Sequence, residues 1–347
     1  MVSIQIEIQI NPKLKPSALK FQEVQREVLN CYFRQNFNEG LRIALEARHL
    51  YPESISKTVF WIACFSALLG DRETALEALE EGIQHGAWWP RNLLLNEPDI
   101  KELRTHPRLL NIANLGDERL NKEKTNCQPK LLVRTPKSYN ENKKLPLLFV
   151  LHWRGGNNTE FEVYWNKVLE QNEILLCLLQ SSQISGDNQF CWDDEKKGLL
   201  ELYQSFVSLK ERVNINLSKI ILAGASQGAR LSLTTLLSDL IPASGFIYAF
   251  PSIKDSHAFI NNFETIKSLQ SLRGSIIAGQ QDNFYQENKL LYEILLHRGV
   301  KGHFFSYPEL GHVFPDDFDR ILNKSVDYIL KLNCNGNESG GANFFGG

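Results

Sequence analysis

The chain has 347 residues, of which 43% are hydrophobic and 22% charged, and its formal net charge is −2. This length fits two domains, and the composition is that of a globular protein. The near-neutral charge gives no indication of a nucleic-acid partner or an anionic membrane surface. The sequence shows no apolar run long enough to span a membrane and no signal-peptide pattern, so we expect a cytoplasmic protein.

The N-terminal segment 1–16 is strand-like. Within residues 2–10, apolar and polar side chains alternate strictly, with isoleucine at four of the five apolar positions. This period of two predicts a strand with one buried face. The sequence does not identify the strand with which it pairs.

A helical region is predicted over residues 17–118. Within it, residues 38–52 align with 72–86 at a shift of 34 residues, which brings alanine onto alanine at the expected helix crossing. A period of 34 resembles the tetratricopeptide repeat, and the resemblance implies either a protein or peptide partner or packing against the rest of the chain. The alternative is an unrelated pair of helical hairpins. The first helix of each pair would span about 21–36 and 55–69.

Two repeats alone would leave an apolar edge exposed. The next stretch, 88–118, begins with two tryptophans and is predicted to supply a capping pair of helices. Charged residues follow, and we interpret 119–129 as a linker into a second domain.

From residue 130 to 333 the pattern changes to apolar strands that alternate with helices. This alternation predicts an α/β domain with a largely parallel sheet, whose active site lies at the carboxyl ends of the strands. The tail, 334–347, is rich in glycine and asparagine and is predicted to be disordered. Strands are expected at 130–135, 146–152, 174–180, 218–223, 245–250, 274–279 and 302–307, and helices at 160–171, 195–213, 227–240, 285–299 and 315–331.

The strongest chemical signal is the sequence Gly224-Ala225-Ser226-Gln227-Gly228, which follows an apolar strand and precedes a helix. In this context GxSxG is a nucleophile elbow, because the sharp turn exposes the serine hydroxyl above the sheet. The two glycines lack Cβ atoms, so strand and helix can close around the turn. The motif alone is weak, and the strand before it and the helix after it strengthen it.

Two later residues complete a catalytic triad. Asp282 follows strand 274–279, and His312 follows strand 302–307, in the order serine, acid, histidine that α/β-hydrolases use. We predict that His312 takes the proton of Ser226 and that Asp282 orients the histidine. Asp282 could instead only cap the helix at 285, and His312 could be an exposed loop residue. Glu309 is a weaker candidate acid, because it is close to His312 in sequence.

The oxyanion formed during acyl transfer needs backbone donors. One is predicted to be the N–H of Gln227, directly after the nucleophile, and the other to come from the loop that follows strand 146–152. This loop reads His152-Trp153-Arg154-Gly155-Gly156. We expect His152 to hold the loop through hydrogen bonds rather than to act as a base.

A further motif, Gln189-Phe190-Cys191-Trp192-Asp193-Asp194, carries two adjacent carboxylates. Without a histidine or further acids they make a poor set of metal ligands, so we expect neither a metal nor a cofactor. Asp193 or Asp194 is predicted to cap the following helix, and Phe190 and Trp192 are predicted to line the substrate cleft.

The segments LPLLFVLHWRGG, QFCWDD, ILAGASQGARLSL and AGQQDNF, with YPELGH after them, resemble the phospholipase/carboxylesterase branch of the α/β-hydrolases, which includes acyl-protein thioesterases. The resemblance covers about 145–330 and implies hydrolysis of an ester or thioester. It also implies that the first-loop oxyanion donor is Arg154. The family usually has glycine directly after the loop histidine, whereas this chain has Trp153, which is expected to narrow the acyl pocket or to shift the loop.

Two other functions remain open at this point. One is a serine peptidase of the same fold, although the chain lacks the gating domain that such enzymes use. The other is a non-catalytic scaffold with a decayed hydrolase domain, against which the complete triad argues.

Overall fold

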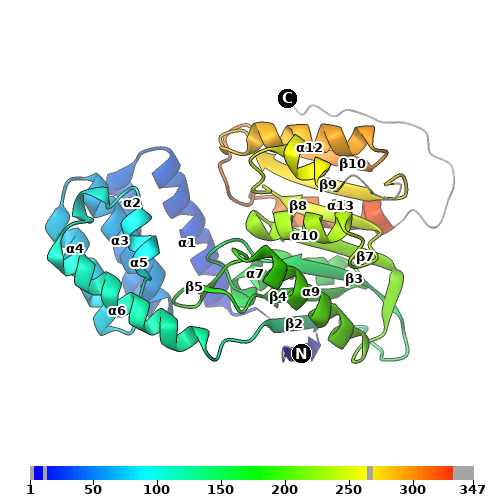
Figure 1. The fold of residues 1–347 in the computed structure, drawn as a ribbon, viewed down its shortest axis with the longest axis horizontal. Coiled ribbons are helices and arrows are strands. Elements are labelled where there is room, and N and C mark those ends of the chain that lie inside the picture. Colours follow the sequence, from blue (N-terminus) through cyan, green and yellow to red (C-terminus); the bar gives the residue numbers. More distant parts are fainter. Residues whose placement is uncertain (1–3, 11–13, 264–268, 331–347) are drawn as a thin grey trace.

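A computed structural model describes residues 4–10, 14–263 and 269–330. A helical region stands beside a sheet that is covered by helices on both faces (Figure 1). The predicted tail 334–347 and the predicted domain end at 333 lie outside the described residues. In the described ranges, no helix is long and apolar enough to cross a membrane.

The helical region contains two helical hairpins at the predicted positions. Its core combines large apolar side chains with small residues such as Ala44, Ala63 and Ala75, which are fully buried and let the helices approach closely. The likeness to tetratricopeptide repeats stays a prediction. The helices are α1 (Pro16–Phe33), α2 (Phe37–Leu50), α3 (Ile55–Leu68), α4 (Arg72–Gln84), α5 (Arg91–Asn96) and α6 (Pro107–Lys124), with short 3-10 turns at Pro52–Ser54 and Lys101–Leu103.

The predicted linker 119–129 is wrong in its first half, because helix α6 continues to Lys124. Charged residues are compatible with an exposed helix, and Lys122 and Lys124 in the last turn are favourable near the negative end of the helix dipole. The connection to the second domain is therefore only a few residues long.

The sheet has eight strands in the order β1-β2-β4-β3-β7-β8-β9-β10. Neighbouring strands are parallel except for β2 and β4, so β1 and β2 run opposite to the other six. A separate short hairpin, β5 and β6, was not predicted from the sequence. The strands are β1 (Gln5–Ile10), β2 (Lys130–Thr135), β3 (Leu145–Leu151), β4 (Leu175–Gln180), β5 (Ile184–Gly186), β6 (Gln189–Phe190), β7 (Ile215–Ala225), β8 (Gly245–Ala249), β9 (Arg273–Gly279) and β10 (Lys301–Tyr307).

Each face of the sheet carries its own apolar core. Successive residues of β3 show this, since Leu147 and Phe149 belong to one core and Leu148 and Val150 to the other. Strands buried on both faces read as continuous apolar runs, which is why the sequence revealed them. The covering helices are α7 (Asn158–Trp165), α8 (Val168–Gln171), α9 (Glu195–Lys210), α10 (Gln227–Leu237), α11 (Ser256–Asn261), α12 (Tyr285–His297) and α13 (Phe318–Leu330).

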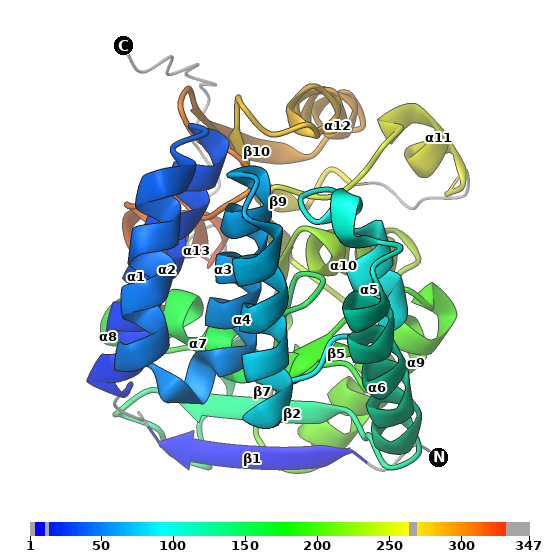
Figure 2. The ribbon, with the colours of Figure 1, turned by 90° about the vertical axis from the view of Figure 1, so that its left-hand side faces the viewer.

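Strand β1 lies at the edge of the sheet, parallel to β2 (Figure 2). The predicted buried face is only partly correct, because Ile8 and Ile10 are 40% and 64% exposed. An edge strand has a neighbour on one side only, so fewer of its side chains are covered. Glu7 fastens the strand to the domain by an ion pair of 3.1 Å with Arg134.

Candidate active site

Ser226 occupies the turn between β7 and α10. Its backbone has φ 53° and ψ −118°, a conformation that few residues other than glycine adopt. The surrounding sheet holds it there, because its N–H donates a hydrogen bond of 2.9 Å to the carbonyl of Ala249 on β8. Strain of this kind gathers at functional sites, and here it lies at the predicted nucleophile.

The two glycines of the motif are required by close backbone contacts. A Cβ atom at Gly228 would lie 2.4 Å from the carbonyl oxygens of both Leu151 and His152. A Cβ atom at Gly224 would lie 2.8 Å from the Leu151 oxygen. The end of β3 therefore packs directly against the turn, which brings the loop after β3 next to Ser226.

His312 connects Ser226 and Asp282. Its Nε2 lies 2.7 Å from Ser226 Oγ, and its Nδ1 lies 2.7 Å from Asp282 Oδ2. The Asp282 side chain is 2% exposed, and its other oxygen accepts a hydrogen bond from the N–H of Phe284, so it also caps the turn before α12. Glu309 does not take part, since its side chain is 84% exposed and lies 3.8 Å from Arg34 of the helical region.

His152 holds the loop after β3, as expected. Its Nδ1 donates to the carbonyl of Trp153 over 2.7 Å, and its Nε2 accepts from the N–H of Ser181 over 3.2 Å. This pairing fits a neutral imidazole with its proton on Nδ1. Burial lowers the pKa of His152 to about 4, so the ring stays neutral at physiological pH.

Phe190 and Trp192 hold the same loop through hydrogen bonds. The N–H of Gly155 donates to the carbonyl of Phe190, and Trp192 Nε1 donates to the carbonyl of His152, over 2.7 and 2.8 Å. Both side chains are buried, and Trp192 is only 1% exposed. That they line the substrate cleft stays a prediction.

Three side chains, two from loops and one from the start of α10, join beside Ser226. Arg154 donates two hydrogen bonds to Asp193, from Nε over 3.2 Å and from a terminal nitrogen over 3.1 Å. Gln227 Nε2 donates to the same carboxylate over 2.8 Å, and Gln227 Oε1 accepts from the N–H of Trp192 over 2.8 Å. Partial burial opposes the charge of Asp193, but the bonds from Arg154 and Gln227 lower the pKa of Asp193. Its neighbour Asp194 caps α9, as predicted for one of the two acids.

The backbone N–H groups of Arg154 and Gln227 are both available. Neither donates a hydrogen bond to another described residue. Gln227 is the first residue of α10, where N–H groups have no partner within the helix and favour negative charge. The sequence predicted these two groups as oxyanion donors.

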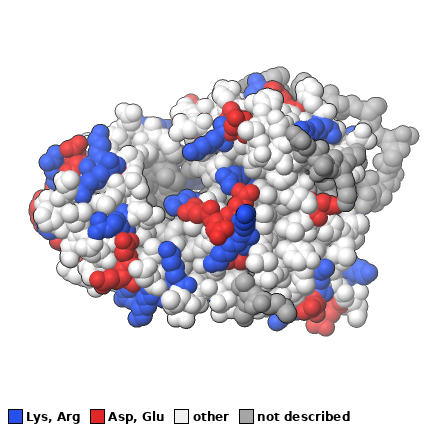
Figure 3. All heavy atoms as spheres, viewed as in Figure 1, with Lys and Arg blue, Asp and Glu red and all other residues white. Residues whose placement is uncertain are grey.

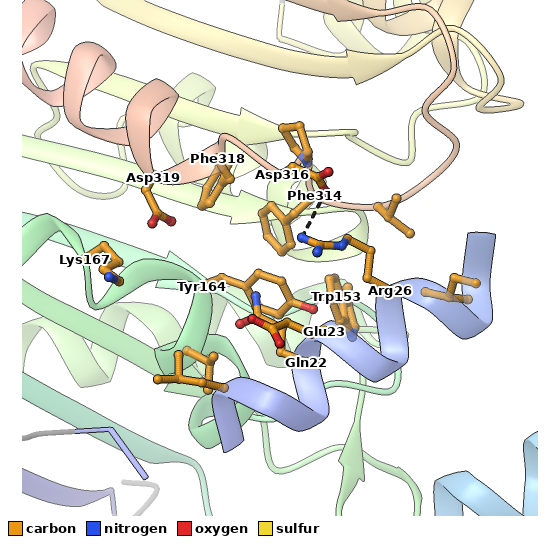
Figure 4. Close-up of a pocket in the computed structure, with 15 residues that line it drawn as sticks. Gln22, Glu23, Arg26, Trp153, Tyr164, Lys167, Phe314, Asp316, Phe318 and Asp319 are labelled. Atoms are coloured by element: carbon orange, nitrogen blue, oxygen red, sulfur yellow. Dashed lines mark ion pairs between the residues drawn. The ribbon is translucent and has the colours of Figure 1, made fainter. Parts of the chain in front are cut away.

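Trp153 borders a cavity of about 330 Å³ between α1 and the α/β domain (Figure 4). Its ring packs in an aromatic cluster with Phe161 and Phe314, at centroid distances of 4.9 and 5.5 Å. It therefore faces the helical region and belongs to the core at the same time. The cavity is lined by Leu19, Gln22, Glu23, Arg26 and Leu29 of α1 and by Trp153, Val163, Tyr164, Lys167, Val313, Phe314, Pro315, Asp316, Phe318 and Asp319.

The described residues contain one group of three potential metal ligands, Cys64, Glu97 and Asp99, with ligand atoms within 4.8 Å of one another. Cys64 lies on α3 and the two acids follow α5, so the group belongs to the helical region and not to the Ser226 site. One surface of the molecule carries acidic and basic side chains intermixed rather than a patch of one sign (Figure 3).

No protein-family model matches the chain, and no curated protein does. The strand order and the strand–serine–helix turn define an α/β-hydrolase fold. Among solved structures, an uncharacterized protein from Bacillus cereus ATCC 10987 is 26% identical, with a TM-score of 0.51 over 90% of this chain and 99% of that chain. This match is long enough to include helical residues as well as the sheet.

Two further structures resemble shorter parts of the chain. A carboxylesterase from Bacillus cereus is 16% identical, with a TM-score of 0.45 over 61% of this chain and 98% of that chain. SOBER1 from Arabidopsis thaliana is 17% identical, with a TM-score of 0.44 over 53% of this chain and 99% of that chain.

Proposed function

We propose that this chain is a serine hydrolase that cleaves carboxylic esters or thioesters through an acyl-enzyme. The observation that carries the proposal is the linear arrangement of Ser226, His312 and Asp282, with 2.7 Å at each of its two contacts. A serine hydroxyl becomes a useful nucleophile only when a base within hydrogen-bond reach takes its proton. His312 is that base, and the carboxylate on its far side fixes the tautomer that leaves Nε2 free to accept.

The reaction follows from this arrangement in two halves. Ser226 Oγ bonds to the acyl carbon while its proton moves to His312 Nε2. The carbonyl oxygen then carries negative charge, which the N–H groups of Arg154 and Gln227 stabilise. Collapse of this intermediate expels the alcohol or thiol, which takes the proton from His312. Water attacks the acyl-enzyme by the same steps and releases the acid.

The test is hydrolysis of p-nitrophenyl acetate by the purified chain and by Ser226→Ala. We expect the variant to lose activity by several orders of magnitude while its circular dichroism and melting temperature stay near wild type. Ser218→Ala, an exposed serine on the same strand, is the matched control and should keep full activity. Equal turnover by Ser226→Ala and wild type, or no turnover by wild type, would reject the proposal.

A further inference from the structure

We infer that helix α1 forms the outer wall of the acyl-binding site, so that the helical region completes the substrate site of the α/β domain. This inference rests on the proposed function. It names the class of substrate, an ester or thioester with an apolar acyl group, and it assigns Trp153 as the side chain that limits the length of that group.

The cavity under α1 lies next to the residues of the reaction, because two of its lining residues are their direct neighbours in sequence. Trp153, in its lining, directly precedes the donor Arg154, and Val313 directly follows His312. The ring of Phe250 links the two sides, at centroid distances of 4.7 Å from His312 and 6.3 Å from Trp153. In the acyl-enzyme, the substrate's acyl group is bonded to Ser226 Oγ. An acyl chain that extends from there toward α1 meets Trp153 first and then the cavity.

Helix α1 is fixed against the loop that carries His312. Arg26 forms an ion pair of 2.9 Å with Asp316. Further along the helix, the Phe33 ring packs on Gly311, so closely that a Cβ atom there would lie 3.1 Å from it. These contacts lie on both sides of His312 in sequence, so α1 contacts the loop of the base directly.

One wall of the cavity fits an apolar acyl group, whereas Gln22, Glu23, Lys167 and Asp319 add polar and charged groups to the rest of its lining. The rings of Tyr164 and Phe314 pack in a tilted arrangement at a centroid distance of 4.3 Å and form an aromatic wall (Figure 4). Leu19 and Leu29 of α1 also belong to the lining. Arg26, which is also part of the lining, is already paired with Asp316, so it is not an open anion site. The volume of about 330 Å³ lies at the lower end of the range for small-molecule sites.

The experiment compares p-nitrophenyl octanoate with p-nitrophenyl acetate in four proteins: wild type, Trp153→Gly, Leu29→Trp and the double variant. Removal of the Trp153 ring opens the cavity, so we expect the octanoate-to-acetate ratio of kcat/KM to rise by about tenfold or more. Leu29→Trp fills the cavity from α1, and in the double variant it should abolish this gain in the octanoate-to-acetate ratio. Asn30→Trp, at an exposed position on the same helix, is the control. In the Trp153→Gly background it should leave the gain in the octanoate-to-acetate ratio intact.

Three results would overturn the inference. The gain could persist in the double variant, or Asn30→Trp could abolish it as well. Trp153→Gly could also leave the ratio unchanged while lowering the melting temperature, which would make Trp153 a docking residue only. Leu29→Ala, which enlarges the cavity, tests the same wall without the risk of misfolding and should raise the ratio in the Trp153→Gly background. Absence of acetate hydrolysis in wild type would instead reject the proposed function.

A second inference rests on separate hydrogen bonds. We propose that Asp193 is a positioning residue that sets the distance between the two oxyanion donors. Its carboxylate binds the side chains of both Arg154 and Gln227, whose backbone N–H groups are the proposed donors. One donor lies in the loop after β3 and the other begins α10, more than 70 residues later, and within the described residues no hydrogen bond joins the two residues directly. Asp193 therefore links the side chains of both donor residues, in addition to the bonds that Trp192 makes to Gln227 and to the carbonyl of His152.

Asp193→Asn and Arg154→Met test this role through a transition-state analogue. A trifluoromethyl ketone forms a hemiketal with the serine whose oxygen occupies the oxyanion site. Loss of one full oxyanion donor lowers kcat by about 10²–10³-fold, so misplacement should lower it by roughly tenfold or more, with KM little changed. The affinity for the ketone should fall by the same factor, and the double variant should lose little more than either single one.

Asp194→Asn is the matched control, because asparagine also caps helices and Asp194 does not contact either donor residue. If Asp193→Asn lowers ester hydrolysis but leaves ketone affinity unchanged, or changes neither, Asp193 does not position the donors. If the wild type hydrolyses esters in the same experiment, such a result rejects the role of Asp193 and leaves the proposed function standing.

Discussion

Two glycines, one in each region of the molecule, show how the helical region differs from the α/β domain. At Gly40 on α2, a Cβ atom would lie 2.4 Å from the ring of Phe65, a side chain. At Gly228 on α10, it would lie 2.4 Å from two backbone carbonyl oxygens at the end of β3. A ring can shift at some cost in stability, whereas the backbone beside Ser226 cannot move without moving the reacting groups. Close packing at Gly40 thus serves stability, whereas close packing at Gly228 places chemical groups.

The largest expected effect lies in the α/β domain. Asp282→Asn should lower kcat by about 10⁴-fold, because an amide favours the wrong tautomer of the histidine. Steady-state hydrolysis of an activated ester measures this loss. Glu309→Gln, the other acid near His312 in sequence, should keep activity within about twofold. A severe effect of Glu309→Gln together with a mild effect of Asp282→Asn would show that Glu309, and not Asp282, is the acid that orients His312.

Alanine substitutions at Gly228 and Gly40 test the difference between these two packing contacts. Gly228→Ala should abolish most hydrolysis, since the new methyl group displaces β3 from the elbow. Gly40→Ala should destabilise the protein by about 1–3 kcal/mol, typical of overpacking, and leave kcat within a few-fold. Urea denaturation and ester hydrolysis on both variants separate the two outcomes. Equal losses of activity in both would show that the regions are not distinct in this way.

The smallest effect concerns the histidine that supports the site. Because the pKa of His152 in the folded protein is about 4, the unfolded chain binds its proton first as pH falls through the ordinary value near 6.5. The free energy of unfolding should therefore fall between pH 6.5 and 4, by roughly 2–3 kcal/mol from this residue. Above pH 6.5 its contribution is complete.

Urea denaturation of wild type and His152→Gln at pH 7 and at pH 4.5 measures this contribution. The loss of stability on acidification should be smaller in the variant by that amount. The same loss in both proteins would mean that His152 does not stay neutral in the folded protein.

The sequence predicted the α/β domain well because its signals are local. Each central strand is a continuous apolar run, and the elbow lies between a strand and a helix. The order of Ser226, Asp282 and His312 then follows from the fold, and the structure brings the three side chains together.

Other features depend on contacts between distant segments. The partner of β1 is more than 120 residues away in sequence, and its alternating pattern predicted a buried face that an edge position leaves partly open. Trp192 and Phe190 lie inward because of space under the loop that no local pattern reveals. The link through Asp193 requires two loops and the start of α10 to meet, so the motif that contains Asp193 predicted only a helix cap for its two acids.

The most direct test of the account is covalent labelling of the native chain with a fluorophosphonate, followed by mass spectrometry of its peptides. An activated serine reacts and an ordinary serine does not, so we expect one adduct per chain, on the peptide that contains Ser226. Heat-denatured protein and Ser226→Ala should take no label, and Asp282→Asn should react much more slowly. No adduct on the native wild type, or equal labelling of Ser226→Ala, would contradict the claim that Ser226 is an activated nucleophile.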